Sequence, residues 1–362
     1  MATVLVTGFP GFLGSELVRR VLRRPGGAHV LCLVQEKFEA LARERAAAIT
    51  AAEGVDAARI RLVRGDITVP GLGLADARAA GRGVTEIFHL AAVYDLSVRR
   101  AAALKVNVDG TRHVLDFAEA CGSLQRFQYV STCYVSGRYP GIFREEDLEK
   151  GQKFNNFYEE TKYLAEAEVR RRSAAGLPVS IYRPGIVVGD SVTGETQKYD
   201  GPYYVLRWLL RQPTVAVLPV PSGADLMRVN LVPRDFVVGA IDALSASPVS
   251  LGRCYQLADP DPPTIDDAIG MMGEATGRIV ARIPMPVTFA KAAIDWVPGV
   301  YRLMQIPSNA VVYFAHPTFY DTTQATRDLE PFGIRCPRLA DYLPRLVEFL
   351  KRHPEISAQA MV

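Results

Sequence analysis

Apolar runs and amphipathic stretches alternate along the first half of the chain. Most of the runs are short and continuously apolar, rather than alternating residue by residue with polar side chains. Such runs are typical of strands buried on both faces, and their alternation with helices is typical of a parallel sheet. The pattern predicts an α/β fold built on a doubly wound parallel sheet. The expected strands cover residues 3–7, 29–34, 59–66, 86–92, 126–135 and 179–189, and the expected helices cover residues 15–24, 37–53, 104–122 and the segment that contains Tyr158.

After residue 189 the pattern changes to Pro- and Gly-rich segments with shorter elements, except for a strand and helix expected over residues 229–244. A chain of 362 residues suits one large domain or two unequal ones. We therefore expect a smaller, discontinuous C-terminal substrate-binding cap over the carboxyl ends of the strands. The expected division is 1–190 plus 229–258 for the larger domain and 191–228 plus 259–362 for the cap.

The stretch TGFPGFLG lies directly after the first expected strand and directly before the first expected helix. In this context the glycines allow a tight turn, and the start of the helix presents unpaired N–H groups to a pyrophosphate. The alternative is a glycine-rich turn that only packs a strand against a helix. The strand–helix units that follow favour dinucleotide binding, and hence a Rossmann-type sheet. The loop residues expected to contact the cofactor are Gly8, Pro10, Gly11, Phe12, Leu13 and Gly14.

The segment after the second expected strand bears on the choice between NAD and NADP. An acidic residue at the end of this strand would bind the ribose 2′-hydroxyl, but the chain has Gln35 there. Lys37 and Arg45 follow, and either could bind a 2′-phosphate; the alternative is that both are solvated helix residues. This favours NADP(H) over NAD(H). Asp66, which closes the third strand, could accept a hydrogen bond from the adenine amino group or act as a cap or turn residue.

Tyr158 and Lys162 are four residues apart in FYEETK and share a helix face. A phenol, with a pKa of about 10, is a poor acid at neutral pH, but a neighbouring ammonium group stabilises the phenolate and lowers that pKa. Thr132, near the end of the strand expected at 126–135, would offer a second hydroxyl to the same carbonyl oxygen. The three residues predict hydride transfer to a carbonyl; the alternative is an ordinary charged helix surface.

With these motifs in place, the sequence resembles a known family, the extended short-chain dehydrogenases/reductases. The matching motifs are spread over the first 190 residues: TGFPGFLG, GDIT, FHLAA, NVDGT, YVSTCYV, YEETK and RPGIVVGD. The resemblance implies that Thr132, Tyr158 and Lys162 are catalytic. Asn107 could instead be an ordinary helix residue, and we expect a structural role for Ser131. The cofactor contacts that the resemblance implies, beyond the glycine loop, are Asp66, Ile67, Ala91, Ala92, Asn107, Pro184, Gly185, Ile186 and Val187.

Within that family the sequence is similar to the male-sterility, fatty acyl-CoA reductase and thioester reductase branch. The similar segments include FYEETKYLAEAEV, VVGDSVTGETQKYDGPYY and RDLEPFGIRCPRLADYLP. Members of this branch commonly use NADPH and reduce acyl thioesters, on coenzyme A or a carrier, to aldehydes or alcohols. Gln35 departs from the branch, whose second strand usually ends with an arginine suited to a 2′-phosphate. The similarity is looser over the cap.

Three other functions stay open. A ketone or secondary-alcohol dehydrogenase, of the hydroxysteroid or flavanol type, would use the same three residues with a different pocket. A sugar-nucleotide epimerase fits less well, because the cap lacks an obvious basic cluster for a pyrophosphate. A non-catalytic dinucleotide-binding protein would need none of the three residues.

The expected cap is apolar: residues 212–221 and 283–307 carry few charges. Such segments suit an acyl chain or another hydrophobic carbonyl compound. The alternatives are a small-domain core, a dimer contact, or peripheral membrane contact through Trp296 with Lys291 and Arg302 beside it. The apolar residues singled out are Met285, Trp296, Tyr301 and Met304.

Four residues are candidates for contact with the substrate: Tyr94, Cys133, Tyr134 and Arg228. Cys133 adjoins Thr132, but no base is evident beside it, so we expect a pocket wall rather than a nucleophile. Arg228, with His316, could steer a phosphate of coenzyme A or phosphopantetheine, or each could be a structural residue.

Charge and cysteine usage narrow the setting of the protein. The formal net charge of +3 is spread along the chain, which argues against a nucleic-acid partner. Five cysteines without CxxC spacing argue against a disulfide framework or a metal site and suit a reducing cytoplasm. No apolar segment reaches the ~18 residues that span a bilayer, and the early first strand leaves no room for a signal peptide. The family resemblance suggests a homodimer through helices at 104–121 and 157–173.

Overall fold

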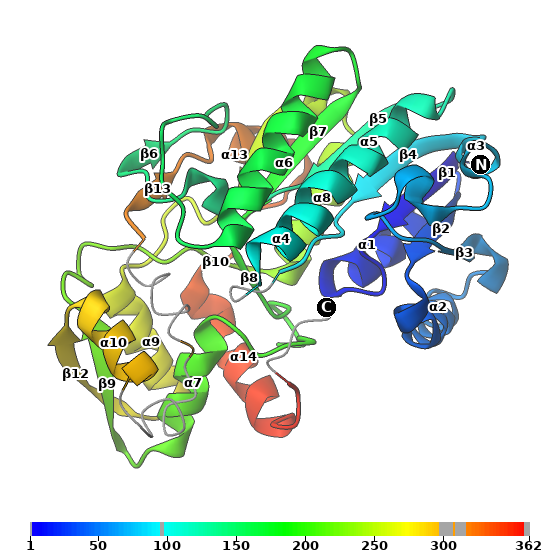
Figure 1. Cartoon of the computed structure of the whole chain (residues 1–362). Coiled ribbons are helices and arrows are strands. Elements are labelled where there is room, and N and C mark those ends of the chain that lie inside the picture. Colours follow the sequence, from blue (N-terminus) through cyan, green and yellow to red (C-terminus); the bar gives the residue numbers. More distant parts are fainter. Residues whose placement is uncertain (1, 95–97, 297–306, 308–315, 358–362) are drawn as a thin grey trace.

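The computed structural model describes residues 2–94, 98–296, 307 and 316–357. Its largest element is a parallel sheet of seven strands: β1 (Ala2–Thr7), β2 (Ala28–Val34), β3 (Ile60–Arg64), β4 (Val84–His89), β5 (Arg126–Val130), β7 (Val179–Pro184) and β11 (Cys254–Leu257). The strand order is β11-β7-β5-β4-β1-β2-β3 (Figure 1), and every neighbouring pair is parallel. The expected doubly wound sheet is confirmed, and its strand order reverses between β1 and β4.

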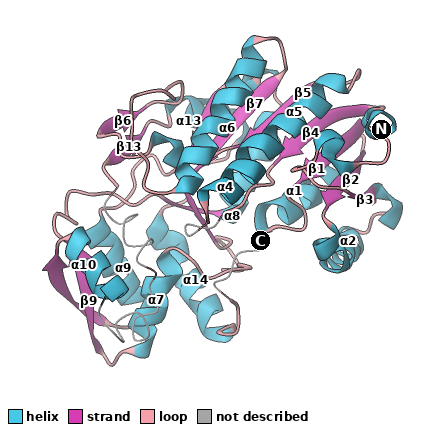
Figure 2. Ribbon diagram, in the orientation of Figure 1, coloured by secondary structure: helices cyan, strands magenta, loops and turns pink. Residues whose placement is uncertain are grey.

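Helices cover both faces of this sheet (Figure 2). They are α1 (Phe12–Leu22), α2 (Glu39–Glu53), α3 (Ala77–Gly81), α4 (Arg100–Ala103), α5 (Gly110–Ala120), α6 (Phe157–Ala174) and α8 (Arg234–Ala246). Val4 and Val6 of β1 pack in one core with α1 and α8. Leu5, between them, packs in the opposite core with α5 and α6. Both faces of the strand are buried because side chains alternate across it, which explains the continuously apolar runs.

The strand expected at 179–189 divides at Gly185. The short strands outside the large sheet include β6 (Gly141–Phe143), β8 (Ile186–Val188), β10 (Leu231–Pro233) and β13 (Thr318–Tyr320). β7 ends before Gly185 and stays in the large sheet, whereas β8 pairs with β10 in a separate two-stranded sheet. A Cβ atom on Gly185 would lie 2.9 Å from the backbone oxygen of Asn230. Glycine therefore lets the chain pass Asn230 as it leaves the large sheet.

The cap has an apolar core of its own. Its elements are α7 (Pro202–Arg211), β9 (Val215–Pro221), α9 (Ile265–Thr276), β12 (Ile279–Met285), α10 (Val287–Trp296) and α14 (Leu339–Arg352). Helices α7 and α14 both pack on α9, and Leu206, Ile269 and Leu346 are buried among them. Among the described residues, no helix combines the length and apolar character needed to cross a bilayer.

One segment of the expected cap lies with the large sheet instead. β13 pairs with β6, and α13 (Thr323–Leu329) packs on β11 and α8. Ala325 and Leu329 are buried in the core beside α1 and α8. The carboxylate of Glu145 accepts hydrogen bonds from the backbone N–H groups of Gln324 and Ala325, at the start of α13. Residues 318–329, expected in the cap, thus pack with the elements of the large sheet.

The helices expected to form a dimer contact, α5 and α6, lie side by side. Leu104, Val108, Leu164 and Ala167 line the groove between their outer surfaces. Nearby, Arg172 forms ion pairs with carboxylates of both helices. The dimer stays a prediction.

We expect Gly194→Ala to destabilise the packing of the cap against the part of the chain that contains the large sheet. Gly194 has a φ of +75°, and a Cβ atom there would lie 2.2 Å from the backbone oxygen of Arg345 in α14. Gly54 has a similar φ of +63° but has open space around its Cβ position. Gly54→Ala should lower the free energy of unfolding by about 1–2 kcal/mol, the cost of an L residue in this conformation. Urea denaturation should show a larger loss for Gly194→Ala; equal losses would contradict the packing argument.

Candidate active site

The candidate site lies at the carboxyl ends of the strands, where the strand order reverses between β1 and β4. Ligands of doubly wound sheets bind in the crevice at this point. The loops that leave the two strands approach closely, because a Cβ atom on Gly8 would lie 3.0 Å from the backbone nitrogen of Ala91. Ala91 donates a hydrogen bond from its N–H to the hydroxyl oxygen of Thr7, the last residue of β1. The glycine loop and the residues Ala91 and Ala92 thus lie beside the same crevice.

The glycine loop folds tightly on itself around the carbonyl of Gly8. The N–H of Gly11 donates to the carbonyl of Gly8, and Gly11 precedes the first residue of α1. A Cβ atom would lie 2.7 Å from the Gly8 oxygen if placed on Gly11 and 2.5 Å if placed on Gly14. The space that these side chains would occupy lies at a helix start whose N–H groups and dipole favour an anion. The loop, with Pro10, Phe12 and Leu13, therefore fits the pyrophosphate of a dinucleotide.

Of the two cations proposed for a 2′-phosphate, Arg45 reaches the loop and Lys37 does not. The Arg45 guanidinium of α2 donates to the backbone oxygen of Pro10 and, over 2.7 Å, to the side-chain oxygen of Gln197. Burial lowers the pKa of Arg45 from its usual value, but an arginine remains charged at neutral pH. Lys37 is exposed, and its ammonium group lies 4.9 Å from the ring centre of Phe38.

Asp66, the candidate adenine contact, lies two residues after the end of β3. One of its carboxylate oxygens accepts from the amide of Gln35, at 2.9 Å, and the other from the N–H of Thr68. Burial opposes ionisation, but these hydrogen bonds and the charge of Lys105 outweigh it, so the pKa of Asp66 is below its usual value. The next residue, Ile67, is buried against Gly110 of α5. An ionised acceptor beside an apolar side chain suits an adenine amino group and ring.

Thr132 follows the end of β5 and Tyr158 lies at the start of α6, and their side chains are close enough for Thr132 to affect the pKa of Tyr158. The strand β5 ends at Val130, and the Thr132 oxygen then accepts from the N–H of Tyr134, starting a short 3-10 turn. The side chain of Asn156 caps α6, which places Tyr158 in its first turn. Burial raises the pKa of Tyr158 above its usual value, and a hydrogen bond between the Thr132 and Tyr158 side chains lowers it in part.

Lys162, one turn along α6, is buried and points towards β5. Its ammonium group donates to the Tyr129 hydroxyl at 3.0 Å and to the Val130 carbonyl at 2.7 Å. Burial lowers the pKa of Lys162 to about 7, and the charge of Glu166 raises it in part. We expected Lys162 to lower the pKa of Tyr158. In this structure the burial of the phenol dominates, so that expectation is not met.

A chain of buried hydrogen bonds connects the glycine-loop strand to α6. The Thr7 hydroxyl bonds to His89 Nδ1 at 2.7 Å, and His89 Nε2 bonds to the Thr111 hydroxyl at 2.9 Å. Thr111 donates to the backbone oxygen of Asn107, whose side-chain amide donates to the Thr161 hydroxyl of α6. Burial lowers the pKa of His89 to about 3, so its ring is neutral. The sequence singled out Asn107 as a cofactor contact, but it did not single out the other four residues of this hydrogen-bond chain.

The backbone geometry around Asn107 explains why it can serve this chain of hydrogen bonds. Asn107 lies in a π-helical segment, Leu104–Asp109, between α4 and α5. Its side-chain oxygen accepts from the N–H of Val93 at 2.8 Å. Such π-bulges occur often at functional sites. Asn107 thus anchors the loop after β4 rather than standing as an ordinary helix residue.

Pro184, Gly185, Ile186 and Val187 border the same crevice at the end of β7. The Thr132 hydroxyl lies 3.5 Å from the carbonyl oxygen of Pro184. Pro184 and Gly185 are buried, whereas Ile186 and Val187 are partly exposed. The segment expected to contact the nicotinamide is therefore next to the Thr132–Tyr158 pair.

Two of the candidate substrate residues lie near Tyr158. The ring of Tyr94 meets the ring of Tyr158 edge to face, with centres 5.0 Å apart, and is 42% exposed. Tyr134 is buried, with its ring 4.9 Å from that of His316. Cys133 is buried and its thiol donates to the carbonyl of Arg183. Burial raises the pKa of Cys133 well above its usual value, which disfavours a nucleophilic thiolate. Its place in a pocket wall stays a prediction.

The residues proposed to steer a phosphate do not form a pair. The guanidinium of Arg228 binds the carboxylate of Asp261 and the carbonyl of Pro262 within the cap. His316 is buried against Tyr134 and Tyr320, and burial lowers its pKa to about 4. A buried, neutral histidine does not attract a phosphate by charge, which favours the structural alternative for His316.

The cap residues singled out for an acyl chain are only partly described. Trp296 is 83% exposed and Phe289 is 65% exposed, so α10 turns large apolar side chains outward. Met285 is partly buried. Tyr301, Arg302 and Met304 lie outside the described residues. Among the described residues, no group of three His, Cys, Asp or Glu side chains could hold a metal ion.

The sequence is similar to a known protein family and to parts of several longer proteins. Residues 6–241 match the model of a protein family described as "Male sterility protein". The chain is 32% identical over 310 residues to part of a linear gramicidin synthase from Brevibacillus parabrevis, covering 82% of this chain and 6% of that protein. It is 29% identical over 271 residues to the L-2-aminoadipate reductase large subunit of Penicillium chrysogenum, covering 69% of this chain and 19% of that protein. The chain thus spans a small part of these relatives.

Among solved structures, the chain is similar to the terminal R domain from the myxalamid PKS-NRPS biosynthetic pathway. The TM-score is 0.81 with 27% sequence identity, and the match covers 99% of this chain and 92% of that one.

We expect Gly14→Ala to weaken dinucleotide binding by about 5- to 150-fold, because overpacking of ~1–3 kcal/mol would displace the Gly8 carbonyl from the loop. The affinity is measured from the change in nicotinamide fluorescence on titration with NADPH. Gly122→Ala is the matched control, because its Cβ position has no neighbour within 4 Å. Equal affinities for the two variants would contradict a pyrophosphate site at this loop.

Proposed function

The chain belongs to the male sterility protein family and is an NAD(P)-dependent oxidoreductase of the extended short-chain dehydrogenase/reductase type, and on that basis we propose that it reduces an acyl thioester held on a phosphopantetheinyl carrier to the aldehyde. The thioester would be bound to a carrier protein, with coenzyme A as the simplest alternative carrier. NADPH would be the reductant. The product would leave as the free aldehyde, or as the alcohol after a second reduction.

The observation that carries this proposal is that Lys162 of α6, one turn from Tyr158, binds the Val130 carbonyl at the end of β5, two residues before Thr132. The three residues thus lie together in a chain that a terminal R domain matches over 99% of its length. Two curated relatives add support, because one is a gramicidin synthase and the other is named a reductase. Both are much longer than this chain, so the carrier and the substrate belong to the proposal.

The residues of the site suit the reduction of a thioester carbonyl. A bound nicotinamide cofactor supplies the hydride for the carbonyl carbon. Thr132 and Tyr158 would donate hydrogen bonds to the carbonyl oxygen as it gains negative charge. The ammonium group of Lys162, held by Tyr129 and Val130, would favour that charge and orient the cofactor ribose.

The remaining steps balance the reaction. When the carbon–sulfur bond breaks, the carbonyl double bond re-forms and the sulfur leaves as a thiolate. The thiolate takes up one proton, so that thioester, NADPH and H⁺ give aldehyde, thiol and NADP⁺. Tyr158 would transfer its proton to the substrate oxygen where the aldehyde is reduced further to the alcohol.

The proposal is tested with purified protein and a panel of substrates: acyl-pantetheine thioesters, acyl-CoAs, carrier-bound acyl thioesters, aldehydes and hydrophobic ketones. NADPH oxidation is followed by absorbance, and the products are identified by mass spectrometry. We expect thioester turnover with release of thiol and aldehyde. Turnover of ketones alone would instead make the protein a secondary-alcohol dehydrogenase.

Tyr158→Phe should reduce turnover by about 10²–10⁴-fold, the range for loss of a positioned acid–base group. NADPH affinity should stay unchanged, because the phenol contacts the substrate. Tyr163→Phe is the matched control on the same helix, since Tyr163 packs against Phe154 instead. A Tyr158→Phe enzyme with normal turnover would contradict the mechanism.

The preference for NADPH is proposed to depend on Arg45. Arg45→Met should weaken NADPH binding roughly tenfold, because a hydrogen bond to a charged group contributes about 1.5–3 kcal/mol. NADH binding should change little. The control is Arg43→Met, because Arg43 lies on the same helix, pairs with Glu39 and is exposed. Equal losses for NADPH and NADH would assign Arg45 to loop structure rather than to the 2′-phosphate.

A further inference from the structure

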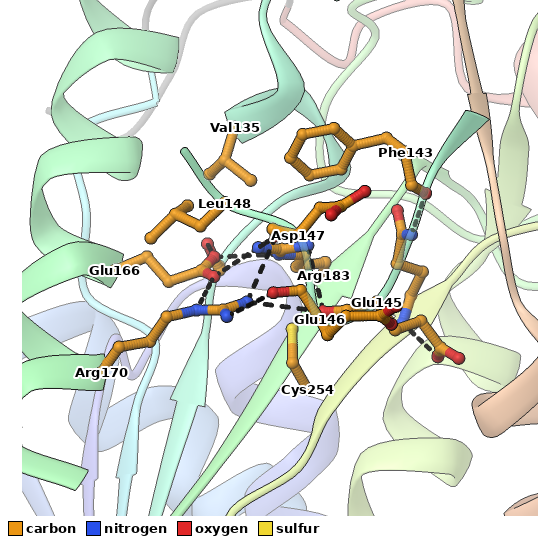
Figure 3. Close-up of polar contacts among 12 residues, drawn as sticks. Val135, Phe143, Glu145, Glu146, Asp147, Leu148, Glu166, Arg170, Arg183 and Cys254 are labelled. Atoms are coloured by element: carbon orange, nitrogen blue, oxygen red, sulfur yellow. Dashed lines mark hydrogen bonds and ion pairs between the residues drawn. The ribbon is translucent and has the colours of Figure 1, made fainter. Parts of the chain in front are cut away.

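A buried carboxylate, Glu166, lies behind the candidate site with all of its hydrogen-bonding capacity used (Figure 3). One oxygen accepts from Arg183 Nη2 at 2.6 Å and from Arg170 Nε at 3.0 Å. The other accepts from the Ser131 hydroxyl at 2.6 Å and from Arg183 Nε at 3.0 Å. Glu166 and Arg183 are both fully buried.

The two arginines of this cluster are also held by backbone oxygens. The guanidinium of Arg183 donates to the carbonyl of Asp147 at 2.6 Å, and that of Arg170 donates to the carbonyl of Glu146 at 2.8 Å. Figure 3 shows both guanidinium groups between α6 and the loop at Glu145–Asp147. The cluster is therefore rigid, because each charged group is fixed by several donors or acceptors.

Each strand or helix that meets at Glu166 also carries a residue of the candidate site. Ser131 immediately precedes Thr132 at the end of β5. Arg183 precedes Pro184 at the end of β7, beside the expected nicotinamide position. Glu166 lies one helical turn beyond Lys162 and two turns beyond Tyr158 on α6. A single side chain thus links the three segments whose relative position sets the geometry of the reaction.

Stability alone does not account for such a cluster. Removing charges from water is costly, and apolar residues of the same volume often stabilise a core as well as a buried ion pair does. A buried ion pair instead restricts its elements to one arrangement, and its charge acts over a short distance in the low-dielectric interior. Both effects here fall on the residues of the candidate site.

The charge of Glu166 acts on Lys162. Burial pushes the pKa of Lys162 down, to about 7, and Glu166 opposes this shift. The carboxylate itself stays ionised, because Arg183 and Arg170 outweigh the effect of its burial and lower the pKa of Glu166 to about 2. The titratable and charged groups that interact with Lys162 or Glu166 from the surrounding elements are His89, Tyr129, Cys133, Arg170, Arg183 and Cys254.

We propose that Glu166 is a positioning residue that aligns Tyr158 and Lys162 with Thr132 and keeps the Lys162 amine protonated during reduction. This inference rests on the proposed function. Glu166 does not contact the substrate; it acts through Ser131, Arg183 and the charge of Lys162.

The test is the pH dependence of turnover in Glu166→Gln. The wild-type rate should fall on the alkaline side as Lys162 loses its proton. Without the carboxylate, we expect this alkaline limb of kcat to move down by about one pH unit, the lower end of the shift that a close opposite charge produces. The rate on the alkaline limb should then fall about tenfold at a fixed pH. NADPH affinity and KM for the thioester should stay near wild type.

Two variants separate charge from position. Glu166→Asp retains the charge but shortens the side chain, so kcat should fall at every pH while the alkaline limb stays in place. Glu168→Gln removes a carboxylate from the outer face of the same helix, where it pairs with Arg171 and Arg172, and should match the wild type. An unshifted limb in Glu166→Gln, or an equal shift in Glu168→Gln, would overturn the proposal.

Two further measurements keep the proposal testable. Thermal unfolding shows whether Glu166→Gln folds. If it does not, Ser131→Ala is tested in its place, because this variant removes the hydrogen bond to the segment after β5 and leaves both arginines paired. Ser131→Ala should then lower kcat without moving the limb, and an unchanged kcat would overturn the positioning role.

If the wild type reduces no carbonyl substrate, the proposed function fails, but the effect on Lys162 is still measurable. Lysine labelled with ¹³C at Cε is titrated by NMR, and the Lys162 signal is identified by its absence in Lys162→Met. A lower Lys162 pKa in Glu166→Gln or, if that variant does not fold, in Glu166→Ala would support the charge effect. An unchanged pKa would overturn it.

Discussion

The buried hydrogen-bond chain from Thr7 to Thr161 is the interaction on which the rest of the site depends. It starts at the strand that leads into the glycine loop and ends on the helix that carries Tyr158 and Lys162. Each polar group along it is buried, so breaking one hydrogen bond would leave a partner unsatisfied in the interior. The glycine loop and helix α6 are thereby held in a fixed relative position, although they are about 150 residues apart in the sequence.

Local signals in the sequence were strong enough to predict the sheet and the positions around the crevice. Strands buried on both faces leave continuously apolar runs in the sequence. A glycine-rich loop predicts dinucleotide binding only where it lies between a strand and a helix. Arg45 could be proposed from its charge alone. Its contact with the Pro10 carbonyl could not, because that contact depends on how α2 packs against the loop.

The parts that sequence reasoning missed are those set by long-range packing. His89 and Glu166 look like ordinary residues of a strand and a charged helix, and only the fold shows that both are buried and fully bonded. The change of sheet at Gly185 and the return of α13 to the body likewise depend on contacts between distant segments. The pKa values of Tyr158 and Lys162 also depend on the fold, because burial opposes the charged form of each group.

The path of the chain between the large-sheet part and the cap constrains how these two parts can move relative to each other. The chain crosses from one to the other near residues 190, 228, 260 and 335, and it also returns to the large sheet between α10 and β13 before α14 joins the cap. A domain that swings open usually does so about one or two flexible connections. Here any opening would have to bend several connections in concert. The cap is therefore suited to small shear movements relative to the large sheet rather than to a wide hinge opening.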